Sequence, residues 1–380
     1  FFVESDLAIS SEKRRDLLDK VSFAEDLGSL LDRVKRIEWI VDLFGKQKIA
    51  TESDIKTSKR AAYFCKHDLV SQIVSEFPEL EGIMGGKYLL KQGESKSVAL
   101  AVLEHYLPRS TFDSLPQSEA GAILALAERF ELLFSIFSKG ERPTGSSDPF
   151  ALRRAGNGIL QILWTKSWDF NLNKFLEKSI NHWSEILPGL NIKPDIIIND
   201  LSEFFHQRIV SLLQESGIDQ DLVQAVAGDT ISIVDLLSDP IDIKLRADLL
   251  SEMRINGNLN SIQAVVTRAS RLADRSELPS NVYCTLEVVN QQLFEKESEY
   301  QMMNVINSLE PIATGSYRDR YRDLANGLEA GSNALANFFD GDQSVMVMTD
   351  NLPMRRNRLN LLAILRNQAT ILADFTQISN

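Results

Sequence analysis

The sequence contains few of the residues that direct disulfide, metal or membrane chemistry. Among its 380 residues are two cysteines and four histidines. Cys65 and Cys284 lie far apart and form no metal-ligand or CxxC spacing, which is typical of a reduced, cytosolic compartment. No apolar run approaches the ~20 residues that cross a bilayer, and the first residues carry no basic signal-peptide region. We therefore expect a cytoplasmic protein with no membrane association.

Several catalytic motifs are also absent. Gly82-Ile-Met-Gly-Gly86 lacks both the GxxxxGK[ST] spacing of a phosphate-binding loop and the GxGxxG spacing of a dinucleotide site, and is predicted to be a turn. The sequence contains no GxSxG nucleophile elbow and no HExxH zinc motif. Nucleophilic catalysis and zinc hydrolysis therefore have no local support.

The charge balance is acidic. The chain has 41 Lys and Arg against 53 Asp and Glu, a formal net charge of −12. This balance argues against nonspecific binding of nucleic acid over the whole surface, but it does not exclude a local basic patch. With 44% hydrophobic residues, a chain of this length can bury a sizeable core and is expected to form two or three domains.

Helical periodicity dominates the sequence, so we expect an all-α fold. From Ile123 to Phe137 the apolar residues step by three and four, which predicts a helix with one face in the core. Glu128, Arg129, Glu131 and Ser135 fall off that stripe. Thr51 followed by Asp54 resembles a capping box, and the apolar spacing continues to Ile73. Val345-Met-Val-Met348 is the best short β-like run, although a helix entrance would look much the same.

His67-Asp68 is the dipeptide that metal-dependent HD phosphohydrolases use to hold a divalent cation. His105 is a candidate third ligand, and Glu128 or Glu131 stands where a helix-borne acid would be needed. No histidine precedes His67 to act as the upstream ligand. The corresponding region carries Arg33 and Arg36 instead, and a guanidinium repels a metal ion. This pattern favours a degenerate, structural HD-like site of His67, Asp68, His105 and Glu128, with a working hydrolase as the alternative.

Met354-Arg-Arg-Asn-Arg-Leu-Asn-Leu-Leu362 is the sharpest basic cluster. At 100° per residue, Arg355 and Arg366 return to nearly the same helical face, with Arg358 adjacent. Such a row can bind phosphates, while guanidinium planes and Asn357 can contact unpaired bases. A solvated cationic face beside an apolar stripe is an equally good interpretation.

The segment from Pro143 to Arg154 is unusual in its order of residues. Its Pro and Gly residues predict a turn, and Asp148 and Pro149 fit the Ncap and first position of a following helix. A helix N-terminus followed by Arg153 and Arg154 suits a polyanion. Pairing of both arginines with the chain's own acids is the alternative, and the spacing alone favours it.

Taken together, these segments resemble the β subunit of bacterial glycyl-tRNA synthetase, nearly end to end. The segments that carry the resemblance are Gly28 to Ile37, Lys66-His-Asp-Leu-Val70, Glu76 to Gly85, Glu104-His-Tyr-Leu-Pro108, Pro143 to Arg154, Phe338-Phe-Asp340 and Val345 to Leu362. Because the family's β subunit is longer and this chain starts at Phe1 rather than Met, we expect the chain to be its C-terminal portion.

The resemblance implies an HD-like helical domain over residues 1–165, a linker over 166–200, and a helical anticodon-binding region of the DALR type over 201–380. It implies tRNA-Gly and the glycyl-tRNA synthetase α subunit as partners in an α2β2 assembly. Glycine activation, with its ATP and Mg, is expected on the α subunit, so no catalytic residue, metal or cofactor is assigned to this chain. The expected tRNA-contacting residues are Arg355, Arg356, Asn357, Arg358 and Arg366.

Two other functions stay open from the sequence. One is a metal-dependent HD phosphohydrolase that uses His67, Asp68 and His105. The other is an assembly scaffold for the α subunit, with tRNA held mainly outside this chain.

Overall fold

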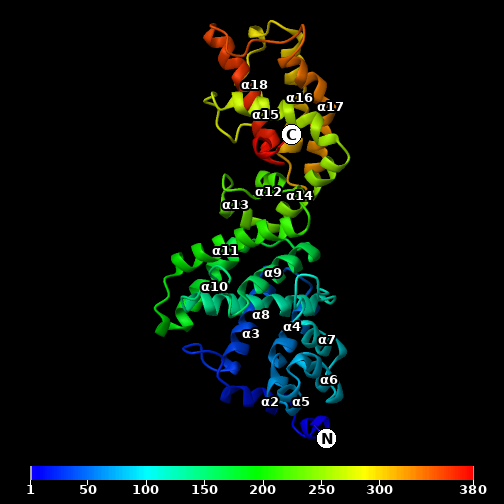
Figure 1. Ribbon diagram of the computed structural model, residues 1–380, viewed down its shortest axis with the longest axis vertical. Helices are drawn as coiled ribbons and strands as arrows, with labels where there is room; N and C mark the ends of the chain where they lie inside the picture. Colours follow the sequence, from blue (N-terminus) through cyan, green and yellow to red (C-terminus); the bar gives the residue numbers. More distant parts are fainter. Residues whose placement is uncertain (1, 380) are drawn as a thin grey trace. The chain divides into compact units, whose positions relative to one another are not determined.

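The computed structural model describes residues 2–379, and all the regular secondary structure within them is helical (Figure 1). Their β pairing is limited to two isolated bridges, Ser22 with Ser29 and Thr144 with Ser147. The all-α prediction is confirmed. None of the helices within this range is both long and apolar enough to cross a membrane.

The chain forms two compact units. Unit 1 comprises the residues up to Ile209 together with Ile233–Ile241, and unit 2 comprises Val210–Ser232 together with the residues from Asp242 onward. Helices α11 (Pro194–Glu215) and α14 (Pro240–Ile255) contribute residues to both.

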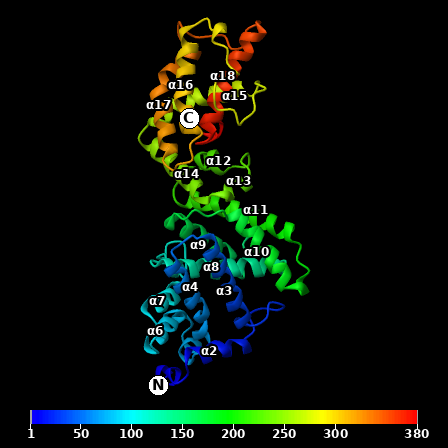
Figure 2. The same ribbon diagram turned by 180° about the vertical axis from the view of Figure 1, so that it is seen from behind.

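Unit 1 is built around one central helix, α8 (Glu119–Ser138). Five other helices pack against α8: α3, α4, α7, α9 and α10 (Figures 1 and 2). The further helices of the unit are α1 (Phe2–Leu7), α2 (Ser11–Leu17), α3 (Leu30–Gln47), α4 (Glu52–Phe64), α5 (Gln72–Glu76), α6 (Ile83–Lys91), α7 (Lys96–Glu104), α9 (Leu152–Lys166), α10 (Leu172–Ile186) and α13 (Ile233–Ser238), with short 3-10 turns at Leu18–Lys20, His67–Val70, Pro78–Leu80 and Pro188–Leu190.

Helix α8 is buried on nearly every side, not only along its apolar stripe. The predicted helix is present, but Glu131 and Ser135, which fall off the stripe, are both 0% exposed. The sequence pattern missed this because polar partners satisfy both residues. Ser135 Oγ donates to Glu131 Oε1 at 2.7 Å, and Trp183 Nε1 of α10 donates to Ser135 Oγ at 3.1 Å.

Residues 166–200, which the family resemblance implies to be a linker, lie inside unit 1. They form α10 and the beginning of α11, and the side chains of Phe175 and Trp183 are fully buried. The Phe175 ring stacks on Phe44 of α3 at 5.0 Å between centroids, so α10 is part of the core of the unit.

The helix predicted to continue from Thr51 to Ile73 ends early. Thr51 caps it as expected, its hydroxyl accepting from the Asp54 N–H at 3.2 Å, but α4 stops at Phe64. Lys66 has a positive φ of 71°, and this left-handed residue turns the chain into a 3-10 turn at His67–Val70. Both His67 and Asp68 therefore point into the interior instead of lying along α4.

Residues 82–86, which were predicted to form a turn, instead lie at the beginning of α6 (Ile83–Lys91). Gly82, with φ of 74°, precedes the first residue of α6, and Gly85 lies inside that helix. A Cβ at Gly85 would lie 3.0 Å from Asp68 Oδ2, so glycine permits the close approach of α6 to the 3-10 turn.

Helix α9 starts three residues later than predicted. Ala151 occupies the Ncap position, and Pro149 lies outside the helix. Asp148 nevertheless caps α9, although it precedes the Ncap residue in the sequence. Its two carboxylate oxygens accept from the backbone N–H groups of Leu152 at 2.7 Å and Arg153 at 2.9 Å.

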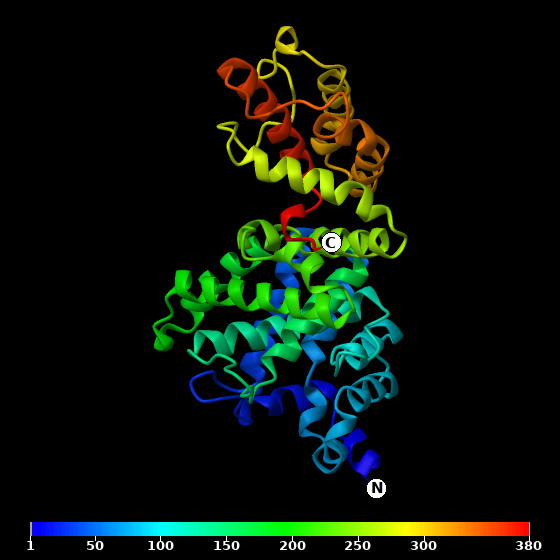
Figure 3. The same ribbon diagram turned by 45° about the horizontal axis from the view of Figure 1, so that its top comes forward.

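Unit 2 contains a group of four helices, α15 to α18, in which α16 packs on α17 and α18, and α15 packs on α17 and α18 (Figures 1 and 3). Residues 345–348 form part of the loop before α18, neither strand nor helix. The helices of the unit, beside the shared α11 and α14, are α12 (Gln220–Ala227), α15 (Asn258–Ala273), α16 (Glu297–Ala313), α17 (Arg320–Phe339) and α18 (Leu352–Thr370), with 3-10 turns at Gln291–Leu293 and Phe375–Gln377.

Candidate functional site

His67 is a buried, neutral imidazole with both ring nitrogens occupied. Its Nδ1 accepts from Arg14 Nε at 3.3 Å, and its Nε2 lies 3.2 Å from the Gly85 carbonyl oxygen, to which it donates in the tautomer this arrangement requires. Burial, reinforced by the Arg14 guanidinium, lowers the pKa of His67 to about 3. Through these two bonds His67 connects Arg14 of α2 with Gly85 of α6. Because both ring nitrogens are bonded, His67 has no lone pair left for a metal.

Asp68 also serves the chain's own backbone. Its Oδ2 accepts from the N–H groups of Gly82 at 2.7 Å and Gly85 at 2.9 Å, which places a carboxylate at the beginning of α6. Burial raises the pKa of this carboxyl group. Its Oδ1 has no hydrogen-bond partner within residues 2–379.

Glu128 and Glu131 of α8 are held by three cations. The Glu128 carboxylate lies 2.9 Å from Lys66 Nζ and 2.8 Å from Arg33. Glu131 accepts from Arg33 at 2.7 Å and from Arg36 at 2.8 Å. Burial acts to raise the pKa of Glu128, but Lys66 and Arg33 together hold it well below its usual range.

His105 lies near the same cations. Its Nδ1 contacts the Val102 carbonyl oxygen at 2.5 Å, and burial, assisted by the Lys66 ammonium, lowers its pKa well below the ordinary value. Lys66 Nζ also lies 3.8 Å from the centroid of the Tyr106 ring.

These contacts give the HD-like cluster a set of fixed cations in place of a metal ion. Within residues 2–379, no three His, Cys, Asp or Glu residues are arranged so as to hold a metal. No sequence pattern marks Lys66 or Arg14 as part of this cluster, although Lys66 directly precedes the HD dipeptide. The side chains of this cluster connect α2, α6 and α8. Their arrangement gives no support to metal-dependent phosphate hydrolysis.

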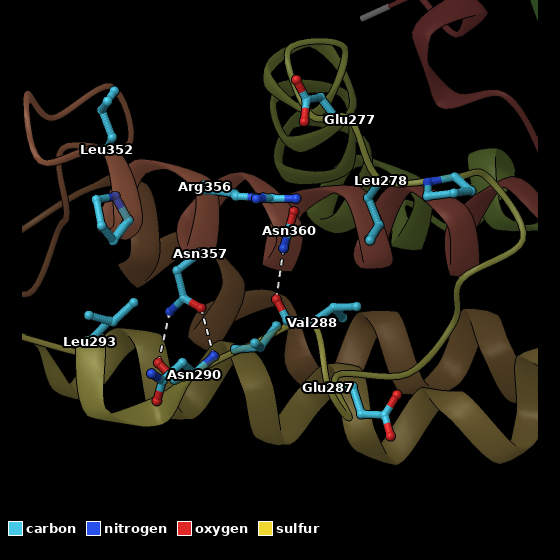
Figure 4. A pocket seen from close by; sticks show the side chains of 13 residues that line it. Glu277, Leu278, Glu287, Val288, Asn290, Leu293, Leu352, Arg356, Asn357 and Asn360 are labelled. Carbon is cyan, nitrogen blue, oxygen red and sulfur yellow. Dashed lines mark hydrogen bonds between the residues drawn. The ribbon is translucent and has the colours of Figure 1, made fainter.

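A second candidate site lies in unit 2, where α18 faces the long segment between α15 and α16 (Figure 4). The two enclose a groove of about 860 Å³. Its wall combines apolar side chains with two carboxylates, amides and one arginine. The lining residues include Glu277, Leu278, Pro279, Glu287, Val288, Asn290, Leu293, Leu352, Pro353, Arg356, Asn357 and Asn360.

A row of amide side chains on α18 fastens this segment. Asn357 both accepts from the Asn290 N–H at 2.7 Å and donates to its carbonyl at 3.0 Å, and Asn360 donates to the Val288 carbonyl at 2.7 Å (Figure 4). Asn367 and Gln368 continue the row with bonds to the carbonyls of Pro279, Val282 and Tyr283. The sequence carried a signal for this role, since a buried helix rarely has four amides without backbone partners for them.

The five residues predicted to contact RNA have different surroundings. Arg358 is only 3% exposed and binds the Glu299 carboxylate at 2.9 Å, the Glu295 carboxylate at 3.0 Å and the Met346 carbonyl. Asn357 is buried in the bonds described above. Arg355 Nε donates to the Thr349 carbonyl at 2.7 Å.

Arg356 and Arg366 complete the set. Arg366 lies 3.6 Å from Asp274, whereas Arg356 is exposed, lines the groove and makes no ion pair with any residue in the range 2–379. The continuous phosphate-facing row suggested by the helical spacing is therefore not present, because α18 turns Arg358 into the interior.

The comparison with known proteins identifies the family. A family profile described as glycyl-tRNA synthetase beta subunit matches residues 1–228. The chain belongs to the glycyl-tRNA synthetase β subunit family. This confirms the resemblance that the sequence motifs indicated.

Relatives in this β subunit family align along the whole chain. Proteins named glycine–tRNA ligase beta subunit from Trichodesmium erythraeum and Acaryochloris marina are 42% and 41% identical to it, over 100% of this chain and 53% of each relative. The corresponding protein from Halothermothrix orenii is 33% identical over 100% of this chain and 52% of its own length. The chain thus spans about half the length of these β subunits.

Proposed function

We propose that this chain is a tRNA-binding part of glycine–tRNA ligase, which positions tRNA-Gly for glycylation catalysed on a separate α subunit. Membership of the β subunit family supports this role. The HD-like cluster supports it too, because both ring nitrogens of His67 and the carboxylate of Glu128 are engaged in internal hydrogen bonds and ion pairs. A positioning subunit assists catalysis by replacing a costly bimolecular encounter with a held geometry.

The proposal assigns distinct roles along the chain. Residues 1–165 act as the HD-like domain near the acceptor arm, and residues 201–380 act as an anticodon-binding region of the DALR type. The chain assembles with the α subunit as α2β2 in the cytoplasm, and ATP and Mg bind on the α subunit.

The groove beside α18 is the observation that carries the anticodon assignment. Leu293, Leu352 and Pro353 offer an apolar surface on which an unpaired base can lie, and Arg356 offers a charge for its phosphate. The carboxylates of Glu277 and Glu287 can accept hydrogen bonds from amino groups on base edges. Apolar surface combined with base-edge acceptors suits an unpaired RNA segment better than a duplex.

The test is the affinity of the full chain, with the α subunit, for tRNA-Gly. Arg356→Ala should weaken binding and reduce the dependence of log K on log salt by roughly 1, the expectation for one lost phosphate contact. Arg318→Ala is the matched control, because Arg318 is exposed in the same unit and does not line the groove. Equal binding by the two variants would refute the anticodon assignment. A chain that assembles with the α subunit but contributes nothing to tRNA binding would instead be a scaffold.

A further inference from the structure

Phe112 is the most exposed large apolar side chain among residues 2–379, with 95% of its surface accessible. It lies in unit 1, in the segment between α7 and α8. A phenylalanine normally gains about 1.5–3 kcal/mol from burial, and the ring of Phe112 gains none of this within unit 1.

The segment around Phe112 is fixed by hydrogen bonds. Asp113 accepts from the backbone N–H groups of Arg109 at 2.8 Å and Ser114 at 2.8 Å. Helix α9 then holds the same segment from the side, because Gln161 Nε2 donates to the Thr111 carbonyl at 2.9 Å. The ring of Phe112 is thereby presented outward by residues bonded on both sides of it.

Two arginines belong to or contact the segment that carries Phe112. Arg154 of α9 reaches the Arg109 carbonyl at 3.5 Å, and Arg109 itself reaches the Glu81 carbonyl at 3.4 Å. Both are exposed, and neither makes an ion pair with a residue in the described range 2–379. Arg60 and Arg142, two other surface arginines of unit 1, form ion pairs with Glu94 at 2.9 Å and Asp200 at 2.6 Å.

The positive charge here comes from side chains rather than from the helix N-terminus. Asp148 already occupies the first N–H groups of α9, so an incoming anion meets the guanidinium groups and not those backbone donors. The acid nearest in sequence to Phe112, Asp113, accepts from two backbone N–H groups, and these bonds together with the Arg109 charge lower the pKa of its carboxyl group.

We propose that Phe112, Arg109 and Arg154 form a binding site for an unpaired nucleotide of RNA. The ring stacks on the base, and the two guanidinium groups contact the adjoining phosphates. An exposed aromatic ring in a segment that also presents exposed arginines fits this ligand, whereas a protein partner would favour a broader apolar surface. The inference rests on the proposed function and adds a site that is separate from the groove of unit 2.

Variants of Phe112 test the stacking directly by fluorescence anisotropy with a labelled tRNA-Gly transcript. Phe112→Ala and Phe112→Leu should each weaken binding about tenfold, and Phe112→Trp should retain affinity because it keeps a stacking face. Arg154→Ala should reduce the salt slope by about 1, while Arg154→Lys should keep it. Phe77→Ala, which removes an exposed ring from another loop of unit 1, is the matched control and should leave binding unchanged.

The outcomes separate the two proposals. Wild-type binding that survives Phe112→Ala would overturn the nucleotide site while leaving the tRNA-binding function in place. Failure of the wild-type assembly to bind tRNA through this chain would overturn both. If Phe112→Ala instead weakened association with the α subunit and left tRNA binding intact, the surface would be a protein interface and the nucleotide site would be wrong.

Discussion

The ammonium group of Lys66 lies 2.9 Å from the carboxylate of Glu128, and the Lys66 side chain is only 2% exposed to solvent. Arg33 shares the same carboxylate at 2.8 Å. The HD-like cluster thus depends on a buried charge pair. Such a pair is costly to break, since removal of Lys66 takes away one of the two cations that bind the largely buried Glu128 carboxylate.

Substitution of Lys66 should therefore destabilise unit 1 strongly. We expect Lys66→Met to lower the free energy of unfolding by about 1–3 kcal/mol, the cost of depriving a buried polar group of one partner, because Glu128 keeps Arg33. Lys35→Met is the control, because Lys35 is 57% exposed and its 3.5 Å pair with Asp32 should contribute less than about 1 kcal/mol. Urea unfolding measures both. A loss in Lys66→Met no larger than in the control would contradict this account of the cluster.

Buried neutral histidines should make stability fall as the pH falls. The pKa of His67 is lowered to about 3, against about 6.5 in an unfolded chain. Below pH 6.5 the unfolded state takes up a proton that the folded state does not, so stability is complete above that pH and decreases toward pH 3. His105 acts in the same direction.

The His67 contribution can be isolated by removing its titration. Each such histidine contributes a slope of up to about 1.4 kcal/mol per pH unit in the free energy of unfolding. His67→Asn keeps an acceptor and a donor but cannot titrate, so its slope between pH 6.5 and pH 5 should be smaller than that of wild type. Identical slopes would show that His67 is not buried and neutral.

Substitution of two arginines of α18, two positions apart, should change the stability by very different amounts. Arg358→Ala leaves the fully buried Glu299 without its 2.9 Å partner and should cost about 3–5 kcal/mol of stability. Arg356→Ala removes an exposed side chain and should change stability by less than about 0.5 kcal/mol. Thermal or denaturant unfolding distinguishes them, and equal losses would refute the assignment of Arg358 to the interior. Any loss of tRNA binding in Arg358→Ala must therefore be interpreted together with its stability.

Much of the fold was predictable because apolar spacing reports helices directly. The helix over 123–137 occurs where the spacing indicated it, inside α8. The spacing failed where polar side chains are buried with partners. Glu131 and Arg358 look like surface residues in the sequence, yet each is satisfied by residues about 60 or more positions away.

The candidate sites were less predictable because they depend on loops. The sequence marked the basic cluster at 355–366 and the HD dipeptide, but it did not show that Lys66 turns the chain after α4. Nor did it indicate the groove, since one wall is a long segment held to α18 by amides. Phe112 gave no sequence signal at all, because a lone phenylalanine in a loop looks the same whether buried or exposed.

Chemical footprinting of tRNA-Gly by the full chain assembled with the α subunit tests the central claim most directly. The account predicts protection of anticodon-arm nucleotides that is lost in Arg356→Ala and retained in Arg318→Ala. Protection of tRNA-Gly that is the same with and without this chain in the assembly would contradict its role in binding tRNA.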